Sequence, residues 1–114
     1  MSDCIFCEII SGQVSSKTIY EDEHVLAFED IAPKAPTHVL VIPKKHIPTL
    51  NDLDEDDVLV MGKIFRAVQQ IVLDRGIHET GYRTVFNVNE AAGQEVFHIH
   101  LHVLGGRQLL WPPG

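Results

Sequence analysis

A run of seven residues places three histidines at every second position among apolar side chains. The run is His98-Ile99-His100-Leu101-His102-Val103-Leu104. Because successive side chains of a strand point to opposite faces, we predict a strand with all three imidazoles on one face. A strand rises about 3.4 Å per residue, so the imidazoles would form a row roughly 14 Å long and not one tight metal cage.

Histidine is a poor default for a solvated strand face, since Thr, Lys or Glu would serve there without titrating near neutrality. A neutral imidazole can attack phosphorus when one nitrogen carries a proton and the other presents a lone pair. His100 has a like neighbour on either side and is the candidate nucleophile, while His102 could bind a phosphoryl oxygen or help to protonate the leaving group. Asn87 and the segment 93–96 could surround a phosphate with amide and backbone N–H groups.

Length and charge limit the class of protein. The chain has 114 residues, with 9 Lys and Arg against 16 Asp and Glu, for a net charge of −7. This balance argues against a broad nucleic-acid or acidic-membrane surface, and no apolar run approaches the ~18 residues that span a bilayer. The start Met1-Ser2-Asp3-Cys4 lacks the basic and apolar parts of a signal peptide. We therefore expect one domain over residues 1–114, located in the cytoplasm, with no nucleic-acid or membrane partner.

The apolar periodicity predicts an α+β fold, with a five-stranded antiparallel sheet, one short helix and one long helix. The expected short helix covers 4–11, the strands 18–21, 24–29, 37–42, 82–87 and 96–104, and the long helix runs from near 52–54 to just before Gly76. A polar, flexible loop is expected over 88–95. The long helix carries two adjacent apolar stripes, Val58, Met61, Phe65, Val68 and Val72 beside Val60, Ile64, Ala67 and Ile71. Their combined width indicates contact with another subunit, although a helix wedged within its own domain would look the same.

The pair Cys4 and Cys7 has a spacing that lets both sulfurs reach one Zn²⁺. A tetrahedral structural site then needs two further nitrogen or sulfur ligands, for which His46 and His98 are the candidates. Two inert buried thiols, or a redox pair, are the other interpretations of the same spacing. The redox interpretation lacks the thioredoxin-like βαβ context.

Several motifs together resemble the histidine triad (HIT) family, whose signature alternates three histidines with apolar residues. They occur in the family's order: Asp30-Ile31-Ala32-Pro33, residues 37–46, Gly81-Tyr82-Arg83, residues 98–104 and Leu104-Gly105-Gly106-Arg107. The ending Trp111-Pro112-Pro113-Gly114 resembles the Hint branch, and Cys4 with Cys7 resembles its bacterial members. The resemblance implies a homodimer with one continuous ten-stranded sheet. It also implies hydrolysis of purine nucleoside phosphoramidates or related conjugates of AMP or GMP, through a nucleotide held covalently on a histidine.

The same resemblance implies roles for individual residues. His100 would be the nucleophile, His102 would contact the phosphate, and the backbone carbonyl of His98 would fix the tautomer of His100. Asp30 would bind the ribose hydroxyls. The purine slot and the phosphate lining would consist of Ile5, Phe6, Ile9, Phe28 and Ile31, and of Asn87, Gly93 and Val96. Zinc on Cys4, Cys7, His46 and His98 would brace the N-terminal helix and leave the chemistry metal-free.

One departure concerns Glu95, because animal Hint proteins have a serine there and a carboxylate would lie near an anion. Nucleotidyltransferase relatives replace the third histidine, so the presence of His102 favours water as the acceptor. Two other functions fit the motifs: a dinucleoside polyphosphate hydrolase, and a zinc-stabilised nucleotide-binding protein with vestigial catalysis. A catalytic metal centre of the cupin type is disfavoured, since no downstream Glu lies in register with His100 and His102.

Overall fold

The computed structural model describes residues 3–114, and the expectation about the chain's start lies partly outside them, at Met1 and Ser2. Five strands form one antiparallel sheet: β1 (Thr18–Glu21), β2 (Val25–Glu29), β3 (Thr37–Pro43), β4 (Tyr82–Phe86) and β5 (Leu101–Gly105). In space they follow the order β1-β2-β3-β5-β4. The helices are α1 (Ile5–Ser11) and α2 (Val58–Asp74). The predicted α+β class is therefore confirmed, whereas the joining of two sheets in a dimer stays a prediction.

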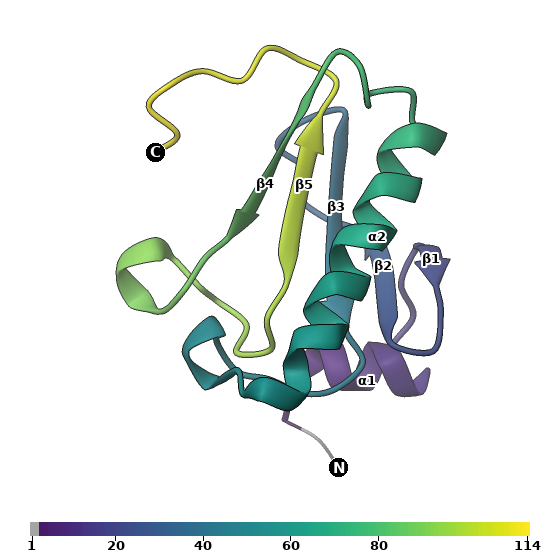
Figure 1. Ribbon diagram of the computed structural model, residues 1–114, viewed down its shortest axis with the longest axis vertical. Helices are drawn as coiled ribbons and strands as arrows, with labels where there is room; N and C mark the ends of the chain where they lie inside the picture. Colours follow the sequence, from purple (N-terminus) through teal and green to yellow (C-terminus); the bar gives the residue numbers. More distant parts are fainter. Residues whose placement is uncertain (1–2) are drawn as a thin grey trace.

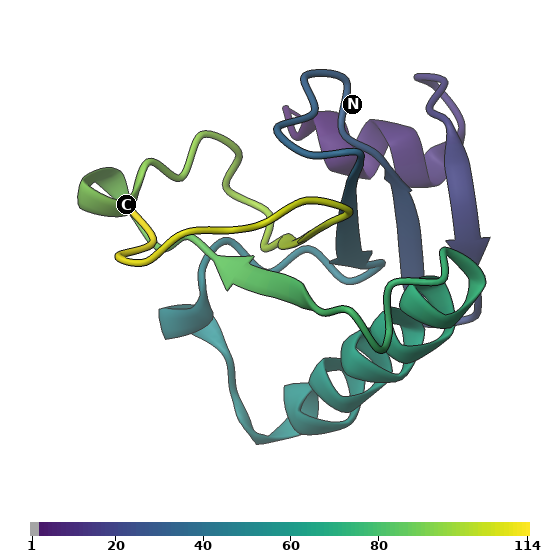
Figure 2. The same ribbon diagram turned by 90° about the horizontal axis from the view of Figure 1, so that it is seen from above.

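The two helices lie on opposite faces of the sheet (Figures 1 and 2). Successive side chains of β2 point to opposite faces of the sheet, so this strand contributes to the core under each helix. Val25 and Ala27 pack in the core beneath α2. Leu26 and Phe28 pack with Phe6 of α1. Burying each large apolar side chain contributes roughly 1.5–3 kcal/mol, so both faces stabilise the sheet. No helix among residues 3–114 has the length and apolar character needed to cross a bilayer.

The first half of the predicted last strand is irregular. Pairing between β3 and β5 ends at Val41 opposite Leu101, and residues 96–100 lie outside the strand. The physical reason lies in Pro43, which has no N–H to donate to the sheet, so the N–H of Ile99 donates to the Ile47 carbonyl at 2.8 Å. The predicted strand over 96–104 is thus wrong in its start by five residues.

The alternation of side chains nevertheless persists through the irregular segment. Ile99 packs with Ile47 and Val60, and Leu101 joins the α2 core. The His98 and His100 rings contact Phe6, on the other face of the sheet. The motif therefore separates imidazoles from apolar side chains as predicted, without a complete strand.

The predicted start of the long helix near 52–54 is also wrong. The acidic residues there form two short 3₁₀ turns, Leu50–Asp52 and Glu55–Asp57, and α2 begins only at Val58. Each turn closes a capping box, in which the aspartate at its end accepts a hydrogen bond from the N–H of Thr49 or Asp54. The aspartates cap these turns in place of the first turn of α2. The short helix ends as expected at Gly12, whose φ of 85° suits glycine.

Candidate active site and metal cluster

One cavity of about 590 Å³ gathers all the residues expected to bind a nucleotide. Its lining includes Ile5, Phe6, Ile9, Phe28, Asp30, Ile31, Asn87, Gly93, Val96, His100 and His102. It is walled by α1 and the loop after β2 at one end, and by the loop before β5 at the other. The structure thus brings these side chains together, although their contacts with a nucleotide stay a prediction.

His100 has one ring nitrogen engaged with the backbone and the other available. Its Nδ1–H donates to the carbonyl oxygen of His98 at 3.0 Å. The Phe6 ring packs against it edge-on, with centroids 5.1 Å apart, so the imidazole is buried at the cavity wall. Because Nδ1 carries the proton, Nε2 of the neutral ring presents a lone pair, which is the state that a nucleophile needs.

His102 has the opposite tautomer, set by a chain of two hydrogen bonds. The backbone N–H of Lys34 donates to Nδ1 of His38 at 3.0 Å, so the proton of neutral His38 lies on Nε2. That Nε2–H lies 2.9 Å from Nδ1 of His102, which accepts it. The proton of neutral His102 is therefore on Nε2, where the ring can donate to an anion.

His102 and His38 are both held neutral by their surroundings. Burial, and after it the neighbouring His100 and His38, lowers the pKa of His102 to about 4. Burial also lowers the pKa of His38, against the opposing effect of Asp30, whose Oδ2 lies 3.3 Å from His38 Nε2. Near pH 7 both rings are uncharged, which preserves the chain of hydrogen bonds.

His98 lies outside the cavity and has a third arrangement. Its side chain is fully buried, and its Nε2–H donates to the Pro43 carbonyl at 2.8 Å. Burial, the largest effect, lowers the pKa of His98 to about 4, so the ring is neutral. Its Nδ1 lone pair therefore points to its neighbours, Cys4, Cys7 and His46. A metal-binding histidine ordinarily has its second nitrogen anchored in this way.

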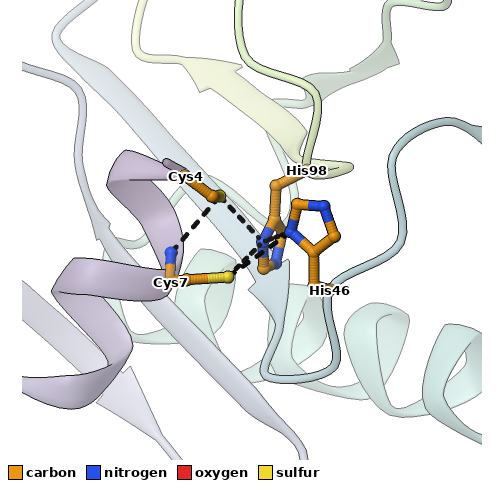
Figure 3. Close-up of side chains that lie close together, drawn as sticks. All are labelled: Cys4, Cys7, His46 and His98. Atoms are coloured by element: carbon orange, nitrogen blue, oxygen red, sulfur yellow. Dashed lines mark hydrogen bonds between the residues drawn. The ribbon is translucent and has the colours of Figure 1, made fainter. Parts of the chain in front are cut away.

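Cys4, Cys7, His46 and His98 converge on a single point (Figure 3). Their donor atoms all lie within 4.8 Å of one another. His98 Nδ1 lies 3.4 Å from Cys4 Sγ, 3.6 Å from Cys7 Sγ and 3.2 Å from His46 Nδ1, and Cys7 Sγ lies 3.4 Å from His46 Nδ1.

These distances fit a tetrahedral metal ion. With bonds of about 2.3 Å to sulfur and 2.0–2.1 Å to nitrogen, a zinc tetrahedron has edges of about 3.3–3.8 Å. The two sulfur and two nitrogen donors form a complete Cys₂His₂ set, so no position is left open for a substrate. The chain therefore contains a group of four residues that could hold a metal in a structural role.

A second group of possible ligands, Asp30, His38 and His102, lies inside the cavity. The 2.9 Å separation of His38 Nε2 and His102 Nδ1 is a hydrogen-bond distance and is shorter than the edge of a metal tetrahedron. These nitrogens are thus engaged with each other, and the group serves to orient His102.

Two residues of the site were not singled out from the sequence. His38 lies outside the three-histidine motif and has no role assigned from the sequence. The signal that identifies it is its register, because Leu40, two residues further along β3, pairs with His102. Gln94 was placed in a flexible loop, but its side chain is buried and accepts from Asn89 N, while its amide donates to the Pro48 and Val96 carbonyls. No local pattern in the sequence indicates this anchoring.

A family model, a curated relative and solved structures all indicate the same protein family for this chain. The model of the HIT domain matches residues 11–109. The purine nucleoside phosphoramidase of Escherichia coli is 45% identical over 107 residues, which are 94% of this chain and 90% of the relative. A HIT family hydrolase from Legionella pneumophila is similar in structure, with a TM-score of 0.96 and 52% identity over 98% of this chain and all of that one. A histidine triad protein from Clostridium difficile has a TM-score of 0.92 at 41% identity, over 96% of each chain.

Proposed function

The chain belongs to the HIT family, and from this premise we propose that it is a hydrolase of purine nucleoside phosphoramidates, acting through a nucleotide bound covalently to His100. The observation that carries the proposal is the set of three histidines in three fixed hydrogen-bond states. His98 offers Nδ1 away from the cavity, His100 offers a lone pair into it, and His102 offers an N–H. The similarity to the Escherichia coli enzyme supports the choice of substrate class.

In the first step, Nε2 of His100 attacks phosphorus and the P–N bond to the leaving amine breaks. The amine takes a proton from solvent as it departs, while the Nε2–H of neutral His102 donates a hydrogen bond to a phosphoryl oxygen and stabilises its negative charge. The ring of His100 then carries both phosphorus and the Nδ1 proton, so it is positively charged. The carbonyl of His98, 3.0 Å from that nitrogen, stabilises the charge.

In the second step, a water molecule attacks phosphorus and the bond to His100 breaks. The water releases a proton to solvent, which balances the proton taken up in the first step, and the nucleoside monophosphate leaves. The positively charged ring is a good leaving group, and it returns to its starting tautomer. The two steps together consume one water and restore His100, while His102 stays neutral throughout.

The rest of the cavity suits a nucleotide. Phe6, Phe28 and Ile9 offer an apolar slot for a purine ring, and stacking on such side chains favours any flat base. Asp30 lies at the adjoining loop, where its carboxylate can accept hydrogen bonds from the ribose hydroxyls. Asn87 and Gly93 lie toward the phosphate end.

We also propose that the metal bound by the cysteine and histidine cluster is zinc. Its ligands would be Cys4 and Cys7 from α1 and its N-cap, His46 after β3, and His98 before β5. Bound zinc supplies a cross-link between these segments. The thiols are available for it in a reducing compartment, which agrees with a cytoplasmic location.

Trapping the intermediate tests the proposal. The protein is mixed with adenosine 5′-phosphoramidate, quenched in base, where phosphohistidine survives, and digested for mass spectrometry. We expect one AMP adduct, on His100, and turnover that is lost in His100→Ala. The exposed His78→Ala serves as the control variant with unchanged turnover. Binding of AMP without turnover or adduct would instead identify a nucleotide-binding protein with vestigial catalysis.

A further inference from the structure

The cavity is rich in carboxylates for a site that is proposed to bind an anion. Its charged lining residues, histidines aside, are Glu29, Asp30, Lys34 and Glu95. Two of the carboxylates are engaged: Glu29 pairs with Arg75 at 2.6 Å, and Asp30 lies beside His38. Within residues 3–114, Glu95 takes part in no ion pair. Its charge is therefore not balanced by a neighbouring cation.

Glu95 borders this cavity on a backbone segment that is anchored by its neighbour. Its neighbour Gln94 is buried and bonded to the Pro48 and Val96 carbonyls, which anchors the backbone there. The side chain of Glu95 is exposed and lines the cavity together with Val96 and His100. The carboxylate therefore borders the same cavity as His100, and within residues 3–114 no ion pair engages it.

Glu95 also lines a second hollow, of about 620 Å³, on the side of the metal cluster. Ile5 and Val96 line both hollows, so the two adjoin at Glu95. The second hollow adds the exposed ring of Phe97 and the carboxylate of Asp3, and the described lining contains no lysine or arginine. A group attached to phosphorus that is too large for the first hollow has room here, next to apolar surface and two carboxylates.

We propose that Glu95 selects the leaving group by charge, and that this chain prefers phosphoramidates whose leaving amine carries a second, cationic group. The inference rests on the proposed function and deepens it. The carboxylate attracts an ammonium or guanidinium on the departing group and repels a carboxylate or phosphate in the same place. Glu95 makes and breaks no bond: the P–N bond still breaks upon attack by His100. Dinucleoside polyphosphates, with several negative charges on the leaving side, are disfavoured for the same reason.

Three substrates of similar length test the charge preference. AMP is joined through a P–N bond to 1,4-diaminobutane, pentylamine or 4-aminobutanoate, which are cationic, neutral and anionic at their free ends. We expect kcat/KM of the wild type to fall in this order, and the cationic-to-anionic ratio to be roughly threefold to tenfold larger than in Glu95→Gln, as for exposed ion pairs. Comparing the two proteins cancels the intrinsic reactivity of each substrate. The difference between the cationic-to-anionic ratios of the wild type and Glu95→Gln should shrink as salt is added.

Two further variants sharpen the result. Glu95→Lys should have a cationic-to-anionic ratio of kcat/KM below that of Glu95→Gln, because a lysine favours the anionic substrate. Glu90→Gln removes an exposed carboxylate from the same loop, outside both hollows, and should keep the wild-type ratio. If Glu95→Gln slows all three substrates by one common factor, the carboxylate acts on the reaction in general and the inference is overturned. The same holds if the ratios of wild type and Glu95→Gln agree.

Plain adenosine 5′-phosphoramidate separates this inference from the function on which it rests. Its leaving group is ammonia, which is too small to reach beyond Glu95. Turnover of this substrate without any charge preference among the other three overturns the role of Glu95 alone. A wild type that turns over none of the four substrates overturns the proposed function and this inference together.

Discussion

The three histidines of the motif have identical side chains. They differ in the hydrogen-bond partner of one ring nitrogen. His98 donates from Nε2 to Pro43, His100 donates from Nδ1 to a carbonyl, and His102 accepts at Nδ1 from His38. Each partner fixes which nitrogen holds the lone pair. At the scale of single residues, the proposed division of labour therefore depends on groups outside the motif as much as on the motif itself.

His38 offers a direct test of this view, because it acts on the cavity through His102. Replacing it by Phe removes the donor to Nδ1 of His102, and leaving a buried acceptor without its partner costs about 1–3 kcal/mol, or roughly fivefold to a hundredfold in rate. We expect His38→Phe to lower kcat by about that factor. His38→Gln, which retains an N–H donor at a similar reach, should recover much of the loss. Equal losses in both variants would show that the donor to His102 is not what matters.

The lowered pKa of His102 also predicts how stability depends on pH. The folded protein protonates this ring near pH 4, whereas an unfolded histidine does so near 6.5. Between these values the unfolded chain binds the extra proton, so the free energy of unfolding falls as pH decreases from about 6.5 to 4. We expect urea denaturation to show a weaker pH dependence in His102→Gln than in the wild type, and an unchanged one in His78→Gln. Identical slopes in all three proteins would contradict the shift.

Sequence reasoning located the motif histidines and the cavity lining because both depend on short-range patterns. His38 and Gln94 escaped it, since their importance follows from contacts between distant segments. His38 meets His102 across 64 positions in the sequence, and Gln94 meets Pro48 across 46. A register between β3 and β5 would have been needed to place His38 beside the motif.

At the scale of elements, the metal cluster is the point where three separate segments meet. α1 and its N-cap contribute two cysteines, the segment after β3 contributes His46, and the segment before β5 contributes His98. The last of these also carries the carbonyl that orients His100. A metal here therefore ties the position of α1, and with it Phe6, to the position of the proposed nucleophile.

Metal removal should accordingly loosen α1 and weaken substrate binding. We expect Cys7→Ser, or treatment with a chelator, to lower Tm by roughly 4 °C or more, the shift that corresponds to a loss of about 1 kcal/mol in a domain of this size. KM should rise more than kcat falls, because Phe6 forms part of the apolar slot. Metal content is measured in parallel by elemental analysis. Ser11→Ala, at the exposed end of the same helix, should retain metal, Tm and KM.

The ends of the helices and strands show where a local sequence pattern is sufficient to predict a boundary. The short helix was predicted within one residue of α1, because a glycine at its end and apolar spacing within it are local signals. The predicted starts of β5 and α2 are wrong for two reasons. Pro43 on the neighbouring strand β3 ends the pairing with β5 early, and the aspartates before α2 close the capping boxes of two 3₁₀ turns. Both errors arise from competition between hydrogen-bond partners.

At the scale of the whole molecule, α2 has an apolar side that is only partly covered by the described residues. Val60 and Ile64 face the sheet, whereas Val58, Phe65 and Leu73 are exposed by 70%, 46% and 55%. These three lie on one side of the helix, because at 3.6 residues per turn their positions fall within about 80° of one another around the helix axis. Phe65 packs on Phe86 of β4, the strand at the edge of the sheet, so the apolar face continues to that edge. We propose that a second copy of the chain covers this face and edge.

The proposed dimer predicts a solution mass of about twice the 12.8 kDa of the chain. Val58→Glu should dissociate it, because a carboxylate is then buried without a partner at the interface. The change is tolerated within the helix itself, since a negative charge at the first residue of a helix is favourable. Lys63→Glu adds negative charge on the polar edge of the exposed side and should remain dimeric. Sedimentation of the three proteins measures the masses, and the Tm of the wild type should rise with protein concentration. A wild type that sediments as a monomer at every concentration, with a constant Tm, would show that the face is left open in solution.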